Sequence, residues 1–178
     1  MLTDPLPASL DVRKAATRGA TIRGTLKPLE LPRFRDLLAA DEGVVEAELA
    51  LSRDEEGRYV VRVVTESSVT VTCQRCLRPM SAALHSESTL AVVWTDEQAR
   101  HLPASLDPLI AGVDEVSLRE LVEDELILAM PPFSYHEQAE CNTVLADLAA
   151  ERVADEPVDR PNPFDVLAQL KPGDTHQE

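Results

Sequence analysis

Apolar and polar residues alternate along the middle of the chain with the two-residue period of β-strands. Val45, Ala47, Leu49 and Leu51 are separated by polar or small residues, so one face of this segment is expected to be buried. A turn at Asp54–Gly57 would join it to the next strand as a hairpin. The predicted strands cover residues 21–26, 45–51, 59–65, 68–73 and 84–94.

Two segments carry the 3.6-residue spacing typical of amphipathic helices. The longer helix is predicted over residues 118–130, because Ser117 is a good N-cap with a glutamate three residues later and a Pro-Pro pair follows the last turn. Its apolar side chains would form the buried face, and the consecutive acidic residues 123–125 would face water. A second helix is expected to begin at Pro32 and to stop before Gly43.

These elements predict an α+β fold in which an antiparallel sheet packs against the long capped helix, with extended N- and C-terminal segments. The acidic, alanine-rich stretch 137–160 is interpreted as a weak helix or as an arm that becomes ordered on binding. Further on, Phe164, Leu167 and Leu170 are apolar at helical spacing, and we expect them to dock on a partner.

The composition is typical of one folded domain and argues against several classes of protein. The chain has 178 residues, of which 44% are apolar, and this is enough to bury a core. Three cysteines cannot all pair, which argues against a disulfide-stapled secreted domain. No apolar window of membrane-spanning length and no signal peptide is expected, so a cytoplasmic location is predicted. Aromatic residues make up only 3%, which argues against RNA binding by base stacking.

Charge is distributed unevenly along the chain. The formal net charge is −15, yet residues 11–35 carry +5 and residues 36–178 carry −19. A basic segment on an acidic body is compatible with RNA on one face and a basic protein on the other. It is equally compatible with a solubilising surface that happens to be uneven, so the net charge alone decides nothing.

The cysteines and one histidine suggest a metal site. Cys73 and Cys76 form a C-x-x-C pair directly after a predicted strand, and His136 and Cys141 follow 60 and 65 residues after Cys76. Three thiols and one imidazole suit a closed tetrahedral zinc site. Two other interpretations stay open. Cys73 continues the apolar face of the preceding strand and would then be a small core residue, and His136 would be an ordinary exposed loop histidine.

A C-x-x-C pair also occurs in thioredoxin-type redox proteins. That chemistry usually needs the first cysteine at a helix N-terminus, where its pKa is lowered. Here the surrounding pattern is antiparallel and Pro79 follows closely, so a thiol oxidoreductase is the less favoured interpretation. The remaining histidines lack a neighbouring nucleophile motif and the six glycines form no phosphate-binding loop, so the sequence favours a protein that is not an enzyme.

Three segments together resemble the YceD family, the large ribosomal RNA subunit accumulation proteins of bacteria and plastids. Residues 71–79 resemble the family's C-x-R-C-L-x-P box, and residues 118–131 resemble its L-V-x-D-E-L-x-L-A-L-P helix, with methionine in place of the last leucine. Residues 161–171 are similar to its P-N-P-F-x-x-L-x-x-L-K ending. His136 and Cys141 follow the helix at about the place where the family has its own histidine and cysteine. The resemblance spans nearly the whole chain.

The resemblance implies a non-enzymatic factor that promotes the synthesis, processing or stability of large-subunit 23S rRNA, and hence a role in ribosome biogenesis. The implied partner is this rRNA or its precursor, contacted directly or indirectly, with no membrane and no small-molecule substrate. An acidic adaptor or chaperone for a basic large-subunit ribosomal protein is the alternative. One YceD-like domain over residues 1–160 and a short tail over residues 161–178 are expected.

For this role the sequence offers three sets of candidate residues. A structural zinc, the only cofactor expected, would be held by Cys73, Cys76, His136 and Cys141. The docking residues would be the three apolar residues of the tail named above. The residues predicted to face RNA are Arg13, Lys14, Arg18, Arg23, Lys27, Arg75 and Arg78.

Overall fold

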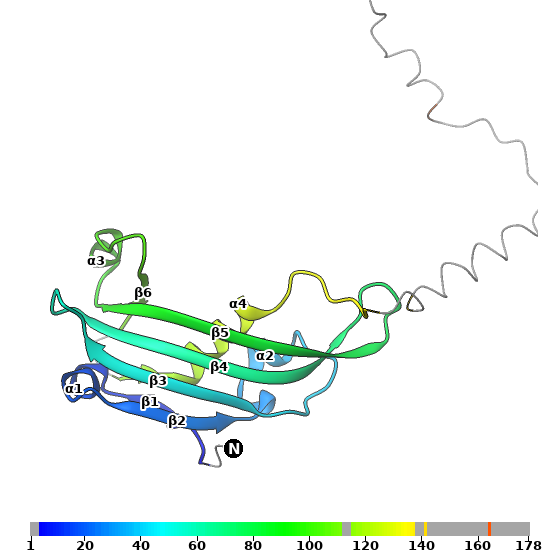
Figure 1. The fold of residues 1–178 in the computed structure, drawn as a ribbon, viewed down its shortest axis with the longest axis horizontal. Helices are drawn as coiled ribbons and strands as arrows, with labels where there is room; N and C mark the ends of the chain where they lie inside the picture. The colour runs from blue at the N-terminus through cyan, green and yellow to red at the C-terminus, as the bar shows by residue number, and fades with distance from the viewer. Residues whose placement is uncertain (1–3, 112–114, 138–140, 142–163, 165–178) are drawn as a thin grey trace, which may run out of the picture. The chain divides into compact units, whose positions relative to one another are not determined.

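The fold is known from a computed structural model that describes residues 4–111, 115–137, 141 and 164 (Figure 1). Its strands are β1 (Ser9–Leu10), β2 (Thr21–Leu26), β3 (Val45–Arg53), β4 (Tyr59–Thr72), β5 (Pro79–Val93), β6 (Asp107–Ile110) and β7 (Val116–Ser117). Five of them form one sheet in the order β2-β3-β4-β5-β6, while β1 pairs with β7. Neighbours from β2 to β5 are antiparallel, and β6 runs parallel to β5.

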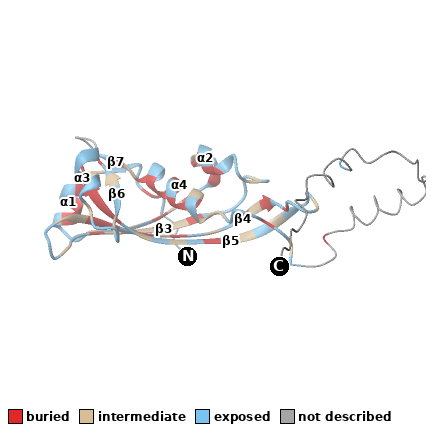
Figure 2. Ribbon diagram, turned by 90° about the horizontal axis from the view of Figure 1, so that it is seen from above, coloured by how far each residue is buried: buried red, intermediate tan, exposed pale blue. Residues whose placement is uncertain are grey.

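Helices cover one face of this sheet. The helices are α1 (Val12–Thr17), α2 (Pro32–Arg35), α3 (Asp96–Arg100) and α4 (Leu118–Ala129), and the short 3₁₀ helix η1 spans Pro28–Glu30. Figure 2 shows α1, α2 and α4 on the same side of the strands. In this layer α1 packs on β3 and β4, α4 packs on β4 and β5, and α2 packs on α4. The predicted α+β class, with an antiparallel sheet packed against a capped helix, is therefore confirmed.

The alternation in the sequence decides which side chains face the helices. Val45, Ala47, Leu49 and Leu51 of β3 are buried, whereas the residues between them are half-buried. The neighbouring strand β4 continues the same pattern, and its odd-numbered residues point into the core. Phe34 from α2 is one of the largest fully buried side chains of this core. Burial of these apolar side chains is the main force that holds the layers together.

Helix α4 begins and ends as its sequence predicts. The Ser117 hydroxyl accepts a hydrogen bond from the backbone N–H of Glu120, at 3.3 Å, and caps the first turn. The prediction that residues 123–125 all face water is wrong, because only Asp124 is exposed. Glu123 and Glu125 are 3% and 5% exposed. Each has polar partners that make its burial tolerable: α2 supplies those of Glu123, and Ser86 of β5 donates to Glu125.

Other elements also differ from the sequence-based expectations. Strand β5 begins at Pro79, five residues before the strand predicted over 84–94. The strands predicted over 59–65 and 68–73 form one strand, β4, because β5 pairs with it through the polar residues between them. The helix predicted from Pro32 is a single turn: its C-cap is Asp36, and the Ala39 N–H donates to the Thr70 carbonyl of β4 at 2.8 Å. The parallel edge strand β6, reached through α3, was not predicted, since four residues carry no readable period.

The N-terminal segment is extended and packs closely against the edge of the sheet. Leu6 is buried, and its N–H donates to the Thr25 carbonyl of β2 at 3.1 Å. This approach requires a glycine at position 24, because a Cβ there would lie 2.6 Å from the Leu6 Cα. Any side chain at this position would therefore push the segment away.

The chain divides into two compact units, Met1–Cys141 and Asn142–Glu178. All of the elements above belong to the first unit. In the second unit only Phe164 is described, and its side chain is exposed. Leu167, Leu170 and most of the stretch 137–160 lie outside the described residues, so their predicted roles stay predictions, as does the boundary at residue 160. No helix in the described part of the chain is both long and apolar enough to cross a membrane.

Candidate metal centre

The C-x-x-C pair occupies the loop at the tip of the β4–β5 hairpin. Cys73 directly follows β4, its N–H donates to the Arg78 carbonyl at 2.9 Å, and its own carbonyl accepts from the Leu77 N–H at 2.8 Å. These two bonds close a tight loop before β5 begins at Pro79. Leu77 has a φ of 58°, the left-handed conformation that glycine adopts more readily. The loop therefore holds both cysteines in a defined and locally strained backbone.

The other two candidate ligands come from the segment after α4. A hydrogen bond of 2.9 Å from the Gln74 N–H to the Ser134 carbonyl attaches this segment to the cysteine loop. Ser134 is itself buried, and His136 follows two residues later. The pair of prolines at 131–132 ends α4 and sends the chain in this direction. Segments 60 residues apart in the sequence are thus fixed side by side.

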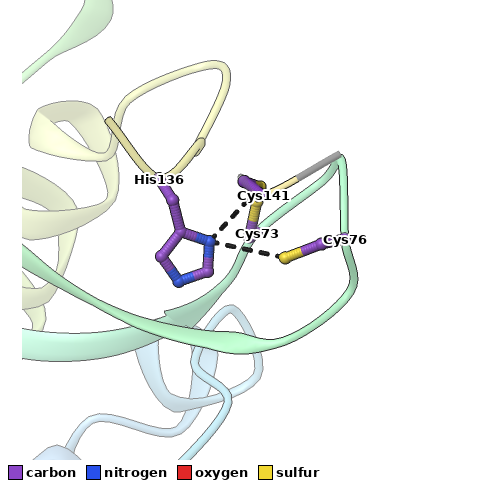
Figure 3. Close-up of side chains that lie close together, drawn as sticks. All are labelled: Cys73, Cys76, His136 and Cys141. Carbon is purple, nitrogen blue, oxygen red and sulfur yellow. Dashed lines mark hydrogen bonds between the residues drawn. The ribbon is translucent and has the colours of Figure 1, made fainter. Parts of the chain in front are cut away.

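Cys73, Cys76, His136 and Cys141 converge on one point, as Figure 3 shows. Sγ of Cys73 lies 3.3 Å from Sγ of Cys141. Nδ1 of His136 lies 3.4 Å from Sγ of Cys76 and 3.5 Å from Sγ of Cys141. All four ligand atoms lie within 4.8 Å of one another. A tetrahedral zinc with its usual bond lengths keeps neighbouring ligand atoms roughly 3.5–3.8 Å apart, so the set fits such an ion.

The pKa values in the cluster are strongly shifted. Burial raises the pKa of the Cys73 thiol, but hydrogen bonds to its sulfur lower that pKa to about 5. The donors are the backbone N–H groups of Cys76, His136 and Arg75, together with the Cys141 thiol. Burial and the two neighbouring thiols raise the pKa of Cys141 to about 11. A divalent cation at the centre would favour the thiolate form of every cysteine there.

The geometry bears on the other interpretations of these residues. Cys73 is fully buried and does continue the inward face of β4, so it contributes to the core as well as to the cluster. His136 is half-buried and directs a ring nitrogen at two sulfurs, which an ordinary exposed loop histidine would not do. The C-x-x-C pair lies in a hairpin loop and not at a helix N-terminus, where thioredoxin-type cysteines acquire their low pKa.

The basic residues predicted to face RNA are spread over three regions. Arg23 is on β2 and Lys27 directly follows that strand. Arg13, Lys14 and Arg18 are on or directly after α1, and the guanidinium of Arg13 lies 4.1 Å from the centre of the Trp94 ring, beside the start of β4. Arg75 and Arg78 are in the cysteine loop at the other end of β4. Since a strand rises about 3.3 Å per residue, these ends are roughly 40 Å apart. The structure therefore does not gather the seven side chains into one patch.

Several of these cations already have partners. Lys14 pairs with Asp11 and Arg23 pairs with Glu48, each at 2.9 Å. The guanidinium of Arg75 lies 5.1 Å from the centre of the Tyr135 ring. Arg18, Lys27 and Arg78 form no ion pair with any residue that the structure describes, and all three are exposed. Exposed surface pairs are weak, so the paired residues are still able to exchange their partners for phosphates.

Two features next to the cluster do not follow from any sequence motif. Ser134 joins the two ligand-bearing segments through its backbone carbonyl, which no side-chain motif reveals. Tyr135 contacts Arg75, although they are 60 residues apart. The sequence contains only one indication of their importance: both residues lie directly before the candidate ligand His136.

Comparison with known proteins identifies the family. A family model described as "Large ribosomal RNA subunit accumulation protein YceD" matches residues 61–171, which include the cysteine loop, α4 and both later ligands. A protein of Haemophilus influenzae with the same description is 30% identical over 167 residues, covering 93% of this chain and 96% of that relative. No solved structure matches the chain. This protein belongs to the YceD family of large ribosomal RNA subunit accumulation proteins.

Proposed function

We propose that this chain promotes the accumulation of large-subunit 23S rRNA, as a non-enzymatic factor in ribosome biogenesis. The observation that carries the proposal is family membership, since the family and the Haemophilus influenzae relative are both described as large ribosomal RNA subunit accumulation proteins. That relative is covered over 96% of its length, so the proposal concerns the whole protein and not a shared fragment.

The cysteine–histidine cluster has a structural role in this proposal. A zinc ion held by Cys73, Cys76, His136 and Cys141 would join the tip of the β4–β5 hairpin to the segment after α4. The convergence of four ligand atoms and the N–H donors around the Cys73 sulfur support this role. Structural zinc sites contribute roughly 10–16 kcal/mol of apparent binding free energy, enough to hold such a connection closed.

Metal content tests this role directly. Protein purified without an affinity tag should contain about one zinc per chain by elemental mass spectrometry, the number expected for one closed site. Cys73→Ser combined with Cys141→Ser should remove it, and His136→Ala should weaken its retention. His85→Ala is the matched control, because His85 is exposed and its ring faces Glu66 at 3.6 Å, away from the cluster. Metal-free protein with three titratable thiols would refute a resident metal.

RNA contact would come from the basic residues predicted above. Support is strongest for Arg75 and Arg78, because the loop that carries them is anchored by hydrogen bonds at both of its ends. Each phosphate that a side chain neutralises should steepen the salt dependence of binding. Replacing both arginines by alanine should therefore weaken binding to rRNA and flatten that dependence, whereas unchanged affinity would refute the assignment.

The alternative proposal, an acidic adaptor for a basic ribosomal protein, is less well supported by the described surface. On the sheet face opposite the helices, Glu48 is paired with Arg23, and Glu87 is paired with Arg62. Two of the carboxylates on this face are thus already compensated by arginines. A pull-down with nuclease treatment separates the proposals: retention of a basic ribosomal protein after the RNA is digested would favour the adaptor.

Depletion of the protein in its own cells tests the function itself. The ratio of 23S to 16S rRNA should fall on depletion and return on re-expression of the unaltered chain. A chain carrying Cys73→Ser and Cys76→Ser should restore the ratio less well, because the loop that these cysteines organise would be released. A ratio that does not respond to depletion would refute the proposed function.

A further inference from the structure

Two aromatic side chains lie exposed next to the cysteine–histidine cluster. Phe133 is 66% exposed and Tyr135 is 43% exposed. Their ring planes are nearly parallel, at 7°, and the ring centres are 6.3 Å apart. Ser134 between them is buried and bonded to Gln74, so the backbone directs the two rings outward while it is held from behind. The rings are therefore positioned by the fold and are not part of a loose loop.

The other aromatic residues of the first unit are used differently. Phe34 is fully buried in the core. Tyr59 and Trp94 pack edge to face against each other and against the core, with ring centres 5.8 Å apart. The outward pair thus stands apart from an otherwise ordinary use of aromatic residues. Exposed apolar surface held in a fixed arrangement commonly marks a binding site.

A cation accompanies the rings. The Arg75 guanidinium lies 5.1 Å from the centre of the Tyr135 ring, within the range of a cation–π interaction. Arg78 in the same loop is also exposed, and it has no ion-pair partner in the part of the chain that the structure describes. The aromatic–arginine platform is defined here as the two rings and Arg75, which contact one another, together with Arg78 of the same loop. It combines flat π faces with guanidinium groups that can bind phosphates.

This combination selects one kind of ligand. Unpaired bases stack on aromatic rings and on guanidinium planes, whereas the bases of a duplex are hidden in its own stack. A duplex is held mainly by a broad basic surface, which a chain of net charge −15 with scattered cations does not offer. Resting on the proposed function, we propose that the aromatic–arginine platform binds unpaired nucleotides of the large-subunit rRNA or its precursor.

Aromatic residues can stack on bases even where they are few. An aromatic content of 3% predicts no base stacking only if the aromatic residues are distributed evenly over the chain. Two rings and one guanidinium are enough to contact two or three bases. What matters is that the fold places these side chains together on its surface.

Fluorescence anisotropy with the full chain tests the platform. The probe is a labelled twelve-uridine RNA, compared with a twelve-base-pair RNA duplex at the same low salt concentration. Wild-type protein should bind the single strand at least about tenfold more tightly. Phe133→Ala and Tyr135→Ala together should weaken binding by about 25-fold or more, because each lost base stack lowers affinity at least about fivefold. Tyr135→Phe should keep affinity within about twofold of wild type.

Salt titrations separate stacking from charge. The aromatic double variant should keep the wild-type salt slope, whereas Arg75→Ala with Arg78→Ala should reduce it by about 0.7 for each phosphate of a single strand that is no longer neutralised. Leu128→Ala is the matched control, since Leu128 is an apolar residue on α4 that is even more exposed than the two rings. Equal zinc content and equal melting temperature across the variants would show that the fold is intact.

The outcomes for the platform and for the proposed function are distinguishable. Equal binding of single strand and duplex, no binding at all, or full binding by the aromatic double variant would each overturn the platform. If the wild-type chain restores 23S rRNA in depleted cells while the platform fails in this way, the proposed function stands without it. If the platform binds RNA but depletion leaves the 23S to 16S ratio unchanged, the platform stands and its rRNA target is wrong.

Discussion

Glu123 is expected to determine whether α2 forms, although it belongs to α4. Its Oε1 accepts hydrogen bonds from the backbone N–H groups of Arg33 and Phe34, at 2.7 and 3.1 Å. Its Oε2 accepts from the Arg33 guanidinium at 2.9 Å. Leu31, the N-cap residue of α2, makes no side-chain capping bond of its own. A carboxylate from a distant helix thus performs the capping that a serine or aspartate usually performs.

The energy at stake follows from the burial of each partner. Because Phe34 is fully buried, Glu123→Ala would remove the carboxylate that accepts from the Phe34 backbone N–H at a place that water does not reach. An unsatisfied buried donor costs about 1–3 kcal/mol. The Arg33 side chain is 54% exposed, so its ion pair is screened and adds about 1 kcal/mol or less. Glu123→Ala should therefore lower the free energy of unfolding by about 1–4 kcal/mol.

Chemical denaturation followed by far-ultraviolet circular dichroism measures this difference, provided that the m-value is unchanged. Glu123→Gln keeps one acceptor oxygen and should lose about 1 kcal/mol. Asp124→Asn is the matched control, because the exposed Asp124 pairs with the same arginine and should change stability by less than about 0.5 kcal/mol. A loss below about 1 kcal/mol for Glu123→Ala, or an equal loss for Asp124→Asn, would refute the capping role.

Three further predictions concern other parts of the chain. Gly24→Ala should destabilise the first unit by about 1–3 kcal/mol in the same assay, because the added Cβ would lie 2.6 Å from the Leu6 backbone; a neutral result would contradict this close contact. Leu77→Gly should relieve the left-handed strain and raise the melting temperature by a few degrees, whereas Arg78→Gly, whose φ is negative, should lower it. Metal chelation should increase hydrogen exchange in residues 73–78 and 131–137 and leave β3 protected, since the buried core of β3 lies outside the cluster; loss of protection throughout would show that the metal supports the whole fold.

The sequence predicted those features of the fold that depend on residues close together in the chain. The period of two in β3 and the cap at Ser117 depend on neighbouring residues, so both were readable from the sequence. The cluster of Cys73, Cys76, His136 and Cys141 was predicted from ligand chemistry, and the structure brings the four residues together. Ligand type was informative here because few other functions require three thiols and an imidazole at such spacing.

Features that depend on distant partners were not predictable. Glu123 looks like a solvent-facing residue, because its partners lie about 90 residues earlier in the chain. The single turn of α2 is short for a similar reason, since the Ala39 N–H finds its acceptor on β4 and not in a longer helix. The pairing of Phe133 with Tyr135 could not be predicted from the aromatic content, because composition gives the number of aromatic residues and not their positions in the fold.

The distance in sequence between the two halves of the cluster also determines the order in which they are synthesised. Cys76, the later of the two cysteines in the C-x-x-C pair, leaves the ribosome 65 residues before Cys141, which at about 5–20 residues per second is roughly 3–13 seconds. During this interval the hairpin that carries them can form, since hairpins fold within microseconds. The nascent chain therefore presents two thiols without their partners. The cluster can close only after α4 has been synthesised and has docked on the sheet. Closure of the cluster therefore coincides with the completion of the first unit.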